Sequence, residues 1–234
     1  RSRGSKGRLA PGYATQYLNA GNIQNQGIEL VLDATPVKNQ NFSWDITLNA
    51  ALNRNKILKL SDLVKTAYLT GDGNPGNLRS VIPLVKEGGS YGDLEGNYWL
   101  KDTKGNHMLN DDGTPLTTYQ TSGTPKIIGN FNPKENLGMT NTFKYKAFFA
   151  RVLIDGRIGG ILVSGTEMNL AFSGIPEVTG KYRDGGLVLG GVDTAGNSLN
   201  KSINSQAFWQ KASGQRYGNA EFFAYDATNF RVRK

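Results

Sequence analysis

A long, regular alternation of apolar and polar residues is the feature that most constrains how this chain of 234 residues folds. Between Asn41 and Arg54 every second residue is apolar, and the residues between are mostly polar. The apolar positions are Phe42, Trp44, Ile46, Leu48, Ala50 and Leu52. Successive side chains of a β-strand point to opposite faces, so the pattern predicts a strand with one apolar face. Its length is about twice the usual 5–6 residues.

Other segments repeat this alternation and predict neighbouring antiparallel strands. They are residues 27–36, 137–145, 148–158 and 221–234. Short connections at residues 37–40 and near Lys146 would join the first four strands into two β-hairpins. Gly27 lies inside a predicted strand, where a glycine indicates a bulge or a close approach of two backbones.

Two long connections, at about residues 55–135 and 159–220, follow the predicted hairpins and are rich in Gly, Asn and Asp. Loops of this length are unusual in a compact soluble domain. Helical periodicity is weak and allows a turn or two at Lys56–Tyr68 and Ser205–Ala212. Short turns at one end of long strands and long loops at the other are typical of outer-membrane β-barrels. We therefore predict an all-β fold of antiparallel barrel strands; a soluble β-sandwich gives the same alternation and stays open as an alternative.

Charge gives little indication of a nucleic-acid partner. The net charge is +8, from 27 Lys and Arg against 19 Asp and Glu. Cations cluster at residues 1–8 and 231–234 and are dispersed elsewhere, so we expect no nucleic-acid binding. We expect residues 1–18 to be a basic, disordered leader. No run of about 18 apolar residues is present, so no transmembrane helix is predicted.

The residue types needed for most enzymatic and metal chemistry are scarce. The chain has no Cys and one His, His107, which excludes thiolate chemistry and disfavours zinc sites and a Ser-His-Asp triad. Two acidic segments, Asp102–Asn106 and Asn110–Gly113, resemble parts of calcium loops, but neither has the Glu that completes one. We interpret both as β-turns. We predict that the chain is not an enzyme and that it has no metal site and no cofactor.

Eight short blocks, in order along about residues 19–233, carry a family resemblance. They are Asn19–Glu29, Phe42–Asp45, Asn53–Ile57, Glu87–Gly96, Ile128–Pro133, Tyr145–Phe148, Asp155–Gly160 and Phe222–Arg233. Together they resemble SusC/RagA-type TonB-linked outer-membrane transporters. The resemblance implies that residues 19–234 correspond to part of the C-terminal third of such a barrel, so we expect a fragment of a longer protein.

The resemblance also implies a function and partners. Such a transporter imports glycans or peptides across the outer membrane of Gram-negative, Bacteroidetes-type cells. Its partners are the rest of the barrel and plug, a SusD-like surface lipoprotein, outer-membrane lipid and the TonB complex, reached through an N-terminal part absent here. A soluble all-β carbohydrate-binding or adhesin module remains the alternative. The two differ in what covers the apolar strand face: lipid in a barrel, a second sheet in a sandwich.

Aromatic residues in the long loops are the candidate contacts to a ligand or partner, because rings stack on sugars and bury a large area. They are Tyr91, Tyr98, Trp99, Phe208, Trp209 and Tyr217. The alternative is that these rings pack the loops together. Charged residues on the polar strand face are expected to line the barrel lumen, where Asp155 and Arg157 could pair; a solvated sheet face is the alternative. They are Glu29, Asp33, Asp45, Arg151, Asp155 and Arg157.

Overall fold

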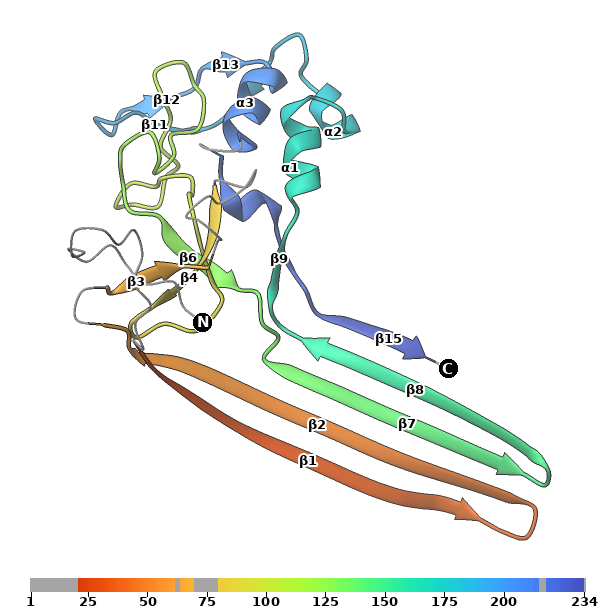
Figure 1. Cartoon of the computed structure of the whole chain (residues 1–234). Helices are drawn as coiled ribbons and strands as arrows, with labels where there is room; N and C mark the ends of the chain where they lie inside the picture. The colour runs from red at the N-terminus through yellow and green to blue at the C-terminus, as the bar shows by residue number, and fades with distance from the viewer. Residues whose placement is uncertain (1–20, 62–63, 70–79, 215–217, 234) are drawn as a thin grey trace, which may run out of the picture.

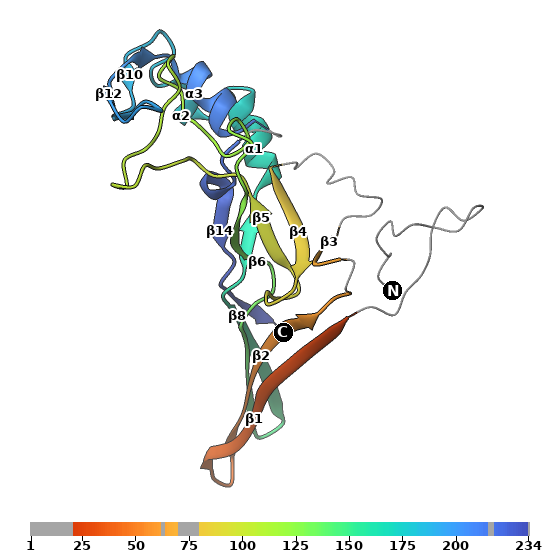
Figure 2. The same ribbon diagram turned by 90° about the vertical axis from the view of Figure 1, so that its left-hand side faces the viewer.

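The computed structural model describes residues 21–61, 64–69, 80–214 and 218–233. These residues form a sheet of long strands and, at one end of it, an assembly of short strands and helices (Figure 1). The two views in Figures 1 and 2 agree that the helices lie at the end of the molecule far from the hairpin turns of the long strands.

The large sheet is antiparallel, with strand order β1-β2-β7-β8-β15. Its strands are β1 (Asn22–Lys38), β2 (Phe42–Lys59), β7 (Glu135–Tyr145), β8 (Phe148–Ile158) and β15 (Asn229–Arg233). The predicted strands at 42–52 and 148–158 are confirmed. Both β1 and β2 continue beyond their predicted ends, so the first long loop begins only after Lys59.

The register of the sheet puts all predicted apolar residues on one side. Trp44 pairs with Phe143, Leu48 with Met139, and Met139 with Ile154. We call this side the apolar face; it carries the even-numbered residues Phe42–Leu52 and the residues in register with them on the neighbouring strands. The opposite, polar face carries the intervening residues, including Asp33, Asp45 and Asp155.

The two hairpin turns are tight, as predicted. In the first, the Asn39 side chain accepts hydrogen bonds from the backbone N–H groups of Asn41 and Phe42, at 3.0 and 2.8 Å. In the second, Lys146 adopts a left-handed conformation with φ of +51° between β7 and β8. Close backbone approach explains Gly27: a Cβ there would lie 2.5 Å from the carbonyl oxygen of Leu52.

The two long loops pack on each other and form what we call the loop cap, residues 60–134 and 159–228 as far as the structure describes them. A four-stranded sheet has the order β3-β4-β5-β6, with β3 (Thr66–Tyr68), β4 (Val81–Lys86), β5 (Asp93–Gly96) and β6 (Lys126–Asn130). Two-stranded pairs join β9 (Ile161–Val163) to β14 (Ala224–Asp226), β10 (Leu187–Val188) to β13 (Ser202–Ile203), and β11 (Gly191–Val192) to β12 (Ser198–Leu199). The helices are α1 (Gly165–Phe172), α2 (Glu177–Gly180), α3 (Ser205–Ala212) and the 3₁₀ helix η2 (Ala220–Phe223).

Two buried apolar clusters hold the loop cap together. Val81 and Leu94 of the first loop pack against Ala220 of the second. Met168 and Ala171 of α1 pack against Phe223. The first cluster joins the two loops into one packed unit, and the second holds α1 against η2 within the second loop.

Three local predictions need correction. The described residues of the segment 56–68 are not helical, because β2 continues to Lys59 in its pairing with β1, and Thr66–Tyr68 form β3. The last segment is not one strand: η2 opens it, and a break at residues 227–228 separates β14 from β15. The helix at Ser205–Ala212 is confirmed, whereas α1 and α2 were not predicted.

Nothing in the described part of the chain covers the apolar face with a second sheet. Phe148, Val232 and Ile28 on this face are 76%, 74% and 70% exposed. A sandwich would bury these residues, so the structure favours a piece of a barrel wall over the sandwich. The fold is an open, antiparallel part of a β-barrel with long structured loops. Among the described residues, no helix has the length and apolar character needed to cross a membrane.

Candidate functional site

Trp99 is anchored inside the loop cap. Its indole N–H donates to the backbone oxygen of Met108 at 2.7 Å, and its ring centroid lies 4.0 Å from that of His107. His107 is half-buried, and its Nδ1 has no hydrogen-bond partner in the structure. Burial, helped by the nearby charge of Lys101, lowers the pKa of His107 from its ordinary value. Trp99 therefore has a packing role, and only part of its ring faces solvent.

Phe208 and Trp209 lie next to each other on α3, with ring centroids 5.1 Å apart in an edge-on arrangement. Phe222 of η2 connects them to Trp99, at 6.1 Å from Phe208 and 6.2 Å from Trp99. Three of the predicted contact residues thus belong to one aromatic cluster, which we define as Trp99, Phe208, Trp209 and Phe222. Phe222 was not singled out from the sequence, because it falls in a segment predicted as a strand.

The remaining predicted aromatics lie elsewhere. The Lys126 ammonium sits 4.4 Å from the ring centroid of Tyr98. Tyr91 is exposed beside Phe131 at the base of the cap, 6.2 Å between centroids. Tyr217 lies outside the described residues. Of the five described candidates, Trp99, Phe208 and Trp209 share the aromatic cluster, whereas the ring contacts of Tyr91 and Tyr98 are with Phe131 and Lys126.

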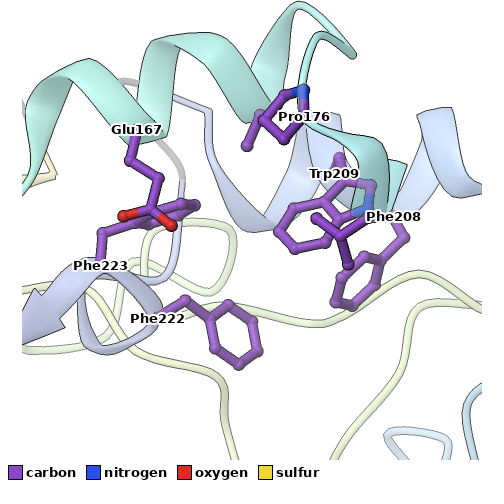
Figure 3. Close-up of a pocket in the computed structure, with 8 residues that line it drawn as sticks. Glu167, Pro176, Phe208, Trp209, Phe222 and Phe223 are labelled. Carbon is purple, nitrogen blue, oxygen red and sulfur yellow. The ribbon is translucent and has the colours of Figure 1, made fainter. Parts of the chain in front are cut away.

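A hollow of about 130 Å³ opens beside the aromatic cluster, between α1, α3 and η2 (Figure 3). Phe208, Trp209 and Phe222 contribute rings to its wall, and Glu167 of α1 contributes a carboxylate. Figure 3 shows the carboxylate of Glu167 above the ring of Phe223. Glu167 was not predicted as a site residue, because only the folded arrangement of three separate segments brings it to these rings.

The two acidic segments are turns, as interpreted from the sequence. The Asp102 carboxylate accepts from the backbone N–H groups of Lys104 and Asn106, both at 2.8 Å, and from the Asn106 amide at 3.0 Å. These bonds, with that of the Asn106 side chain foremost, lower the pKa of Asp102. Asp112 likewise accepts from the backbone N–H of Thr114. Among the described residues, no three His, Asp or Glu side chains converge as a metal site would require.

The polar face of the large sheet is cross-linked by side chains. Thr47 donates to Asp33 at 2.6 Å, and Thr35 donates to Asp45 at 2.8 Å. Asp155 does not pair with Arg157: the Arg233 guanidinium of β15 binds it instead, at 2.6 Å. Arg231 lies directly opposite Asp155 in the register, and Arg233 is its diagonal neighbour. Diagonal neighbours on adjacent strands lie within reach of a long side chain such as arginine.

Comparison with known proteins gives sequence relatives of one kind. Three TonB-dependent receptors of Formosa agariphila match: P3 at 27% identity over 68% of this chain, P39 at 29% over 36%, and P26 at 41% over 27%. The matched regions make up 17%, 7% and 7% of those proteins, so this chain corresponds to a small share of their length. No family model matches the chain.

Solved structures give the same fold. The RagAB peptide importer in its closed-closed state superposes with a TM-score of 0.58 at 15% identity, covering 95% of this chain and 23% of that one. A second structure, of the RagAB peptide transporter, gives a TM-score of 0.53 at 17% identity, covering 94% and 23%. These superpositions show that this chain has the same fold as 23% of each of those chains.

Proposed function

On the premise that the chain is related to TonB-dependent receptors, we propose that it forms part of the barrel wall and loop cap of an outer-membrane transporter. In this proposal the transporter imports glycans or peptides, a SusD-like surface lipoprotein assists it, and the TonB complex supplies energy through a plug carried by the rest of the protein. The cell is Gram-negative and of Bacteroidetes type. The chain itself catalyses no covalent reaction.

The main support for the proposal is that the large sheet has one apolar and one polar face, together with the height of the apolar face. From Phe42 to Leu52 the apolar face of β2 is continuous over ten residue steps. At about 3.4 Å per residue this is about 34 Å along the strand, and a strand tilt of about 40° reduces it to about 26 Å. Outer-membrane barrels present an apolar band about 25 Å high. The face therefore has the dimensions of a lipid-facing surface.

Aromatic residues concentrate at the hairpin end of this face. Trp44 stacks on Phe143 with centroids 5.9 Å apart, and Phe42 pairs with Tyr145 in the register. Barrels carry such aromatic girdles at the two membrane interfaces. The Trp44 indole donates to Asn141 at 3.2 Å, so the one amide on the apolar face of β7 has a partner. The arrangement supports a membrane interface at the hairpin end, with the loop cap on the far side.

The polar face supports an aqueous lumen. It carries acidic residues on β1 and β2 (Glu29, Asp33 and Asp45) and mostly basic residues on β8 and β15 (Arg151, Arg157, Arg231 and Arg233). Charged side chains of this kind are costly against lipid but tolerated in a water-filled lumen. A plug or a substrate inside the barrel would meet this face.

A matched pair of substitutions tests the orientation of the sheet. Leu48→Arg places a cation on the apolar face near the middle of the band, where it costs about 2–4 kcal/mol. Asn49→Arg, at the next residue of β2, places the same cation on the polar face. In the full-length protein we expect Leu48→Arg to lower the amount of barrel assembled in the outer membrane, measured by cell fractionation and heat-modifiable gel mobility. Equal assembly of both variants, or recovery of the protein without detergent, would contradict the proposal.

Substrate class needs a separate measurement. Cells lacking the gene for the full-length protein are grown on single peptide mixtures or single glycans as the limiting nutrient, with the restored gene as control. We expect a growth defect on one of these two classes that the restored gene repairs. Equal growth on every substrate would contradict the transport role while leaving the membrane location intact.

A further inference from the structure

The hollow beside α1 combines an apolar wall with a single charged group. Its wall consists of Ala171, Pro176, Val178, Phe208, Trp209, Phe222 and Phe223. The only ionisable side chain in the lining is Glu167. Three separate parts of the second loop supply these residues, and the buried contact of Phe223 with Met168 and Ala171 holds α1 and η2 in place. The hollow is therefore built by the packed part of the cap.

The Glu167 carboxylate is held in position and remains available to a ligand. The Tyr225 hydroxyl donates to its Oε2 at 2.6 Å, a bond that raises the pKa of Tyr225. Glu167 is exposed, and in the described part of the chain no Lys, Arg or His lies within ion-pair distance of it. One oxygen is thus fixed by a hydrogen bond, and no cation among the described residues balances the negative charge.

We propose that this hollow binds a protonated amine or guanidinium on an apolar stem, which is the chemistry of a lysine or arginine side chain. The stem lies against the rings of Phe208 and Trp209, and the cation reaches Glu167. Aromatic faces attract cations in addition to burying apolar area. This inference goes beyond the proposed transport role, because it concerns the cap alone and does not require that anything be carried through the barrel.

Polarity disfavours other ligand classes. A sugar ring would lose water from its hydroxyl groups and find only the Glu167 carboxylate and the Trp209 indole N–H as polar side-chain groups of the lining, at a cost of about 1–3 kcal/mol for each unpaired group. An anion would be repelled by Glu167. A neutral apolar group would remove water from the carboxylate without compensating its charge.

Binding of a matched ligand pair to the full-length protein in detergent tests the proposal. The probes are Nα-acetyl-lysine methylamide and the norleucine analogue, which keeps the stem and lacks the charge; methyl glucoside is the third probe. By calorimetry we expect the lysine compound to bind at least about five-fold more tightly than the norleucine compound, a gain that salt reduces. Placing lysine within a pentapeptide distinguishes a peptide ligand from a free amine, and binding of either one supports the proposal.

Two variants test whether the preference for the lysine compound depends on the charge of Glu167. Glu167→Gln removes the charge, while its amide oxygen can still accept from Tyr225, so we expect the cap to stay folded and the preference for lysine over norleucine to disappear. Glu177→Gln removes a charge of the same type in α2, outside the lining, and should leave the preference unchanged. Equal affinity for the two amino-acid probes, tighter binding of methyl glucoside, or an unchanged preference in Glu167→Gln would overturn the proposal.

Discussion

Phe223 gives the sharpest test that the loop cap is a packed unit with its own core. Its side chain is 2% exposed, and it belongs to the cluster of Met168 and Ala171, with Trp209 packed against it. The Phe223 carbonyl also accepts from the backbone N–H of Ser164 at 2.9 Å, and a side-chain substitution preserves this bond. The Phe223→Ala variant therefore removes side-chain packing and leaves the backbone connection in place.

The neighbouring residue provides the control. Truncating a buried phenylalanine to alanine costs about 3–5 kcal/mol. Phe222 is 40% exposed, and its aromatic contacts are with Phe208 and Trp99 at centroid distances above 6 Å. Such contacts are worth about 0.5–1.5 kcal/mol, so we expect Phe222→Ala to cost about 1 kcal/mol. Adjacent residues of the same type should thus differ by about 2 kcal/mol or more.

Hydrogen exchange of the full-length protein in detergent measures the difference locally. A cost of about 3–5 kcal/mol raises the equilibrium constant for opening by roughly two to four orders of magnitude. We expect this acceleration for amides of α1 and α3 in Phe223→Ala and less than about tenfold in Phe222→Ala. Amides of β7 and β8 should be unchanged in both. Equal acceleration in the two variants, or loss of protection in β7 and β8, would refute the assignment of a separate core to the cap.

Three further predictions follow from single contacts. Gly27→Ala forces a Cβ to 2.5 Å from the Leu52 carbonyl oxygen, so we expect about 1–3 kcal/mol lower stability of the β1–β2 pair, seen as faster hydrogen exchange there. Because the folded pKa of His107 lies below its ordinary value of 6.5, the unfolded chain binds the proton more readily and the free energy of unfolding falls as pH drops below 6.5. The His107→Phe variant keeps a ring on Trp99, and its unfolding transitions should lose this part of the pH dependence. Ser164→Ala removes the hydroxyl that accepts from the Glu167 N–H at the start of α1 and should destabilise that helix by about 1 kcal/mol, measured by exchange of α1 amides.

The long strands could be predicted from the sequence wherever one of their faces is apolar and the other polar. Residues 42–52 alternate with Ala51 as the one exception, because one side is apolar and the other polar. Residues 148–158 alternate less regularly, since Phe149 and Leu153 lie on the polar face. The ends of β1 and β2 were missed for the converse reason: Asn22–Gln26 and Asn53–Lys59 are largely polar on both faces. Their strand structure comes from pairing with each other, which hydropathy alone does not reveal.

The helices of the cap were predicted unevenly. The helix at Ser205–Ala212 was found from its periodicity, and the structure adds an Asn204 cap that accepts from Ala207. The helix α1 was missed, although Ser164 and Glu167 stand at the spacing of a capping box. That motif is a signal that could have located the start of α1 in the sequence.

The residues of the candidate site come together only in the tertiary structure. Phe208 and Trp209 were predicted from their type and their place in a loop, and the structure brings them to Phe222 and Glu167. Glu167 lies about 40 residues before the aromatic pair, and no spacing rule connects them. The chemistry of the hollow, a carboxylate among rings, therefore could not be predicted from the sequence.

The way the cap closes sets an order for folding. The β7–β8 hairpin forms across one tight turn, whereas the cap is joined by the bond from the Ala220 N–H to the Asn97 carbonyl, which lie far apart in the sequence. Contacts between distant residues carry a larger loop-closure entropy and form more slowly than local ones. The hairpins are therefore ready to pair before the cap closes. Until residues near 220 dock, the buried side chains of the first loop are open to proteases and to premature association, so the last step of folding is also the most vulnerable.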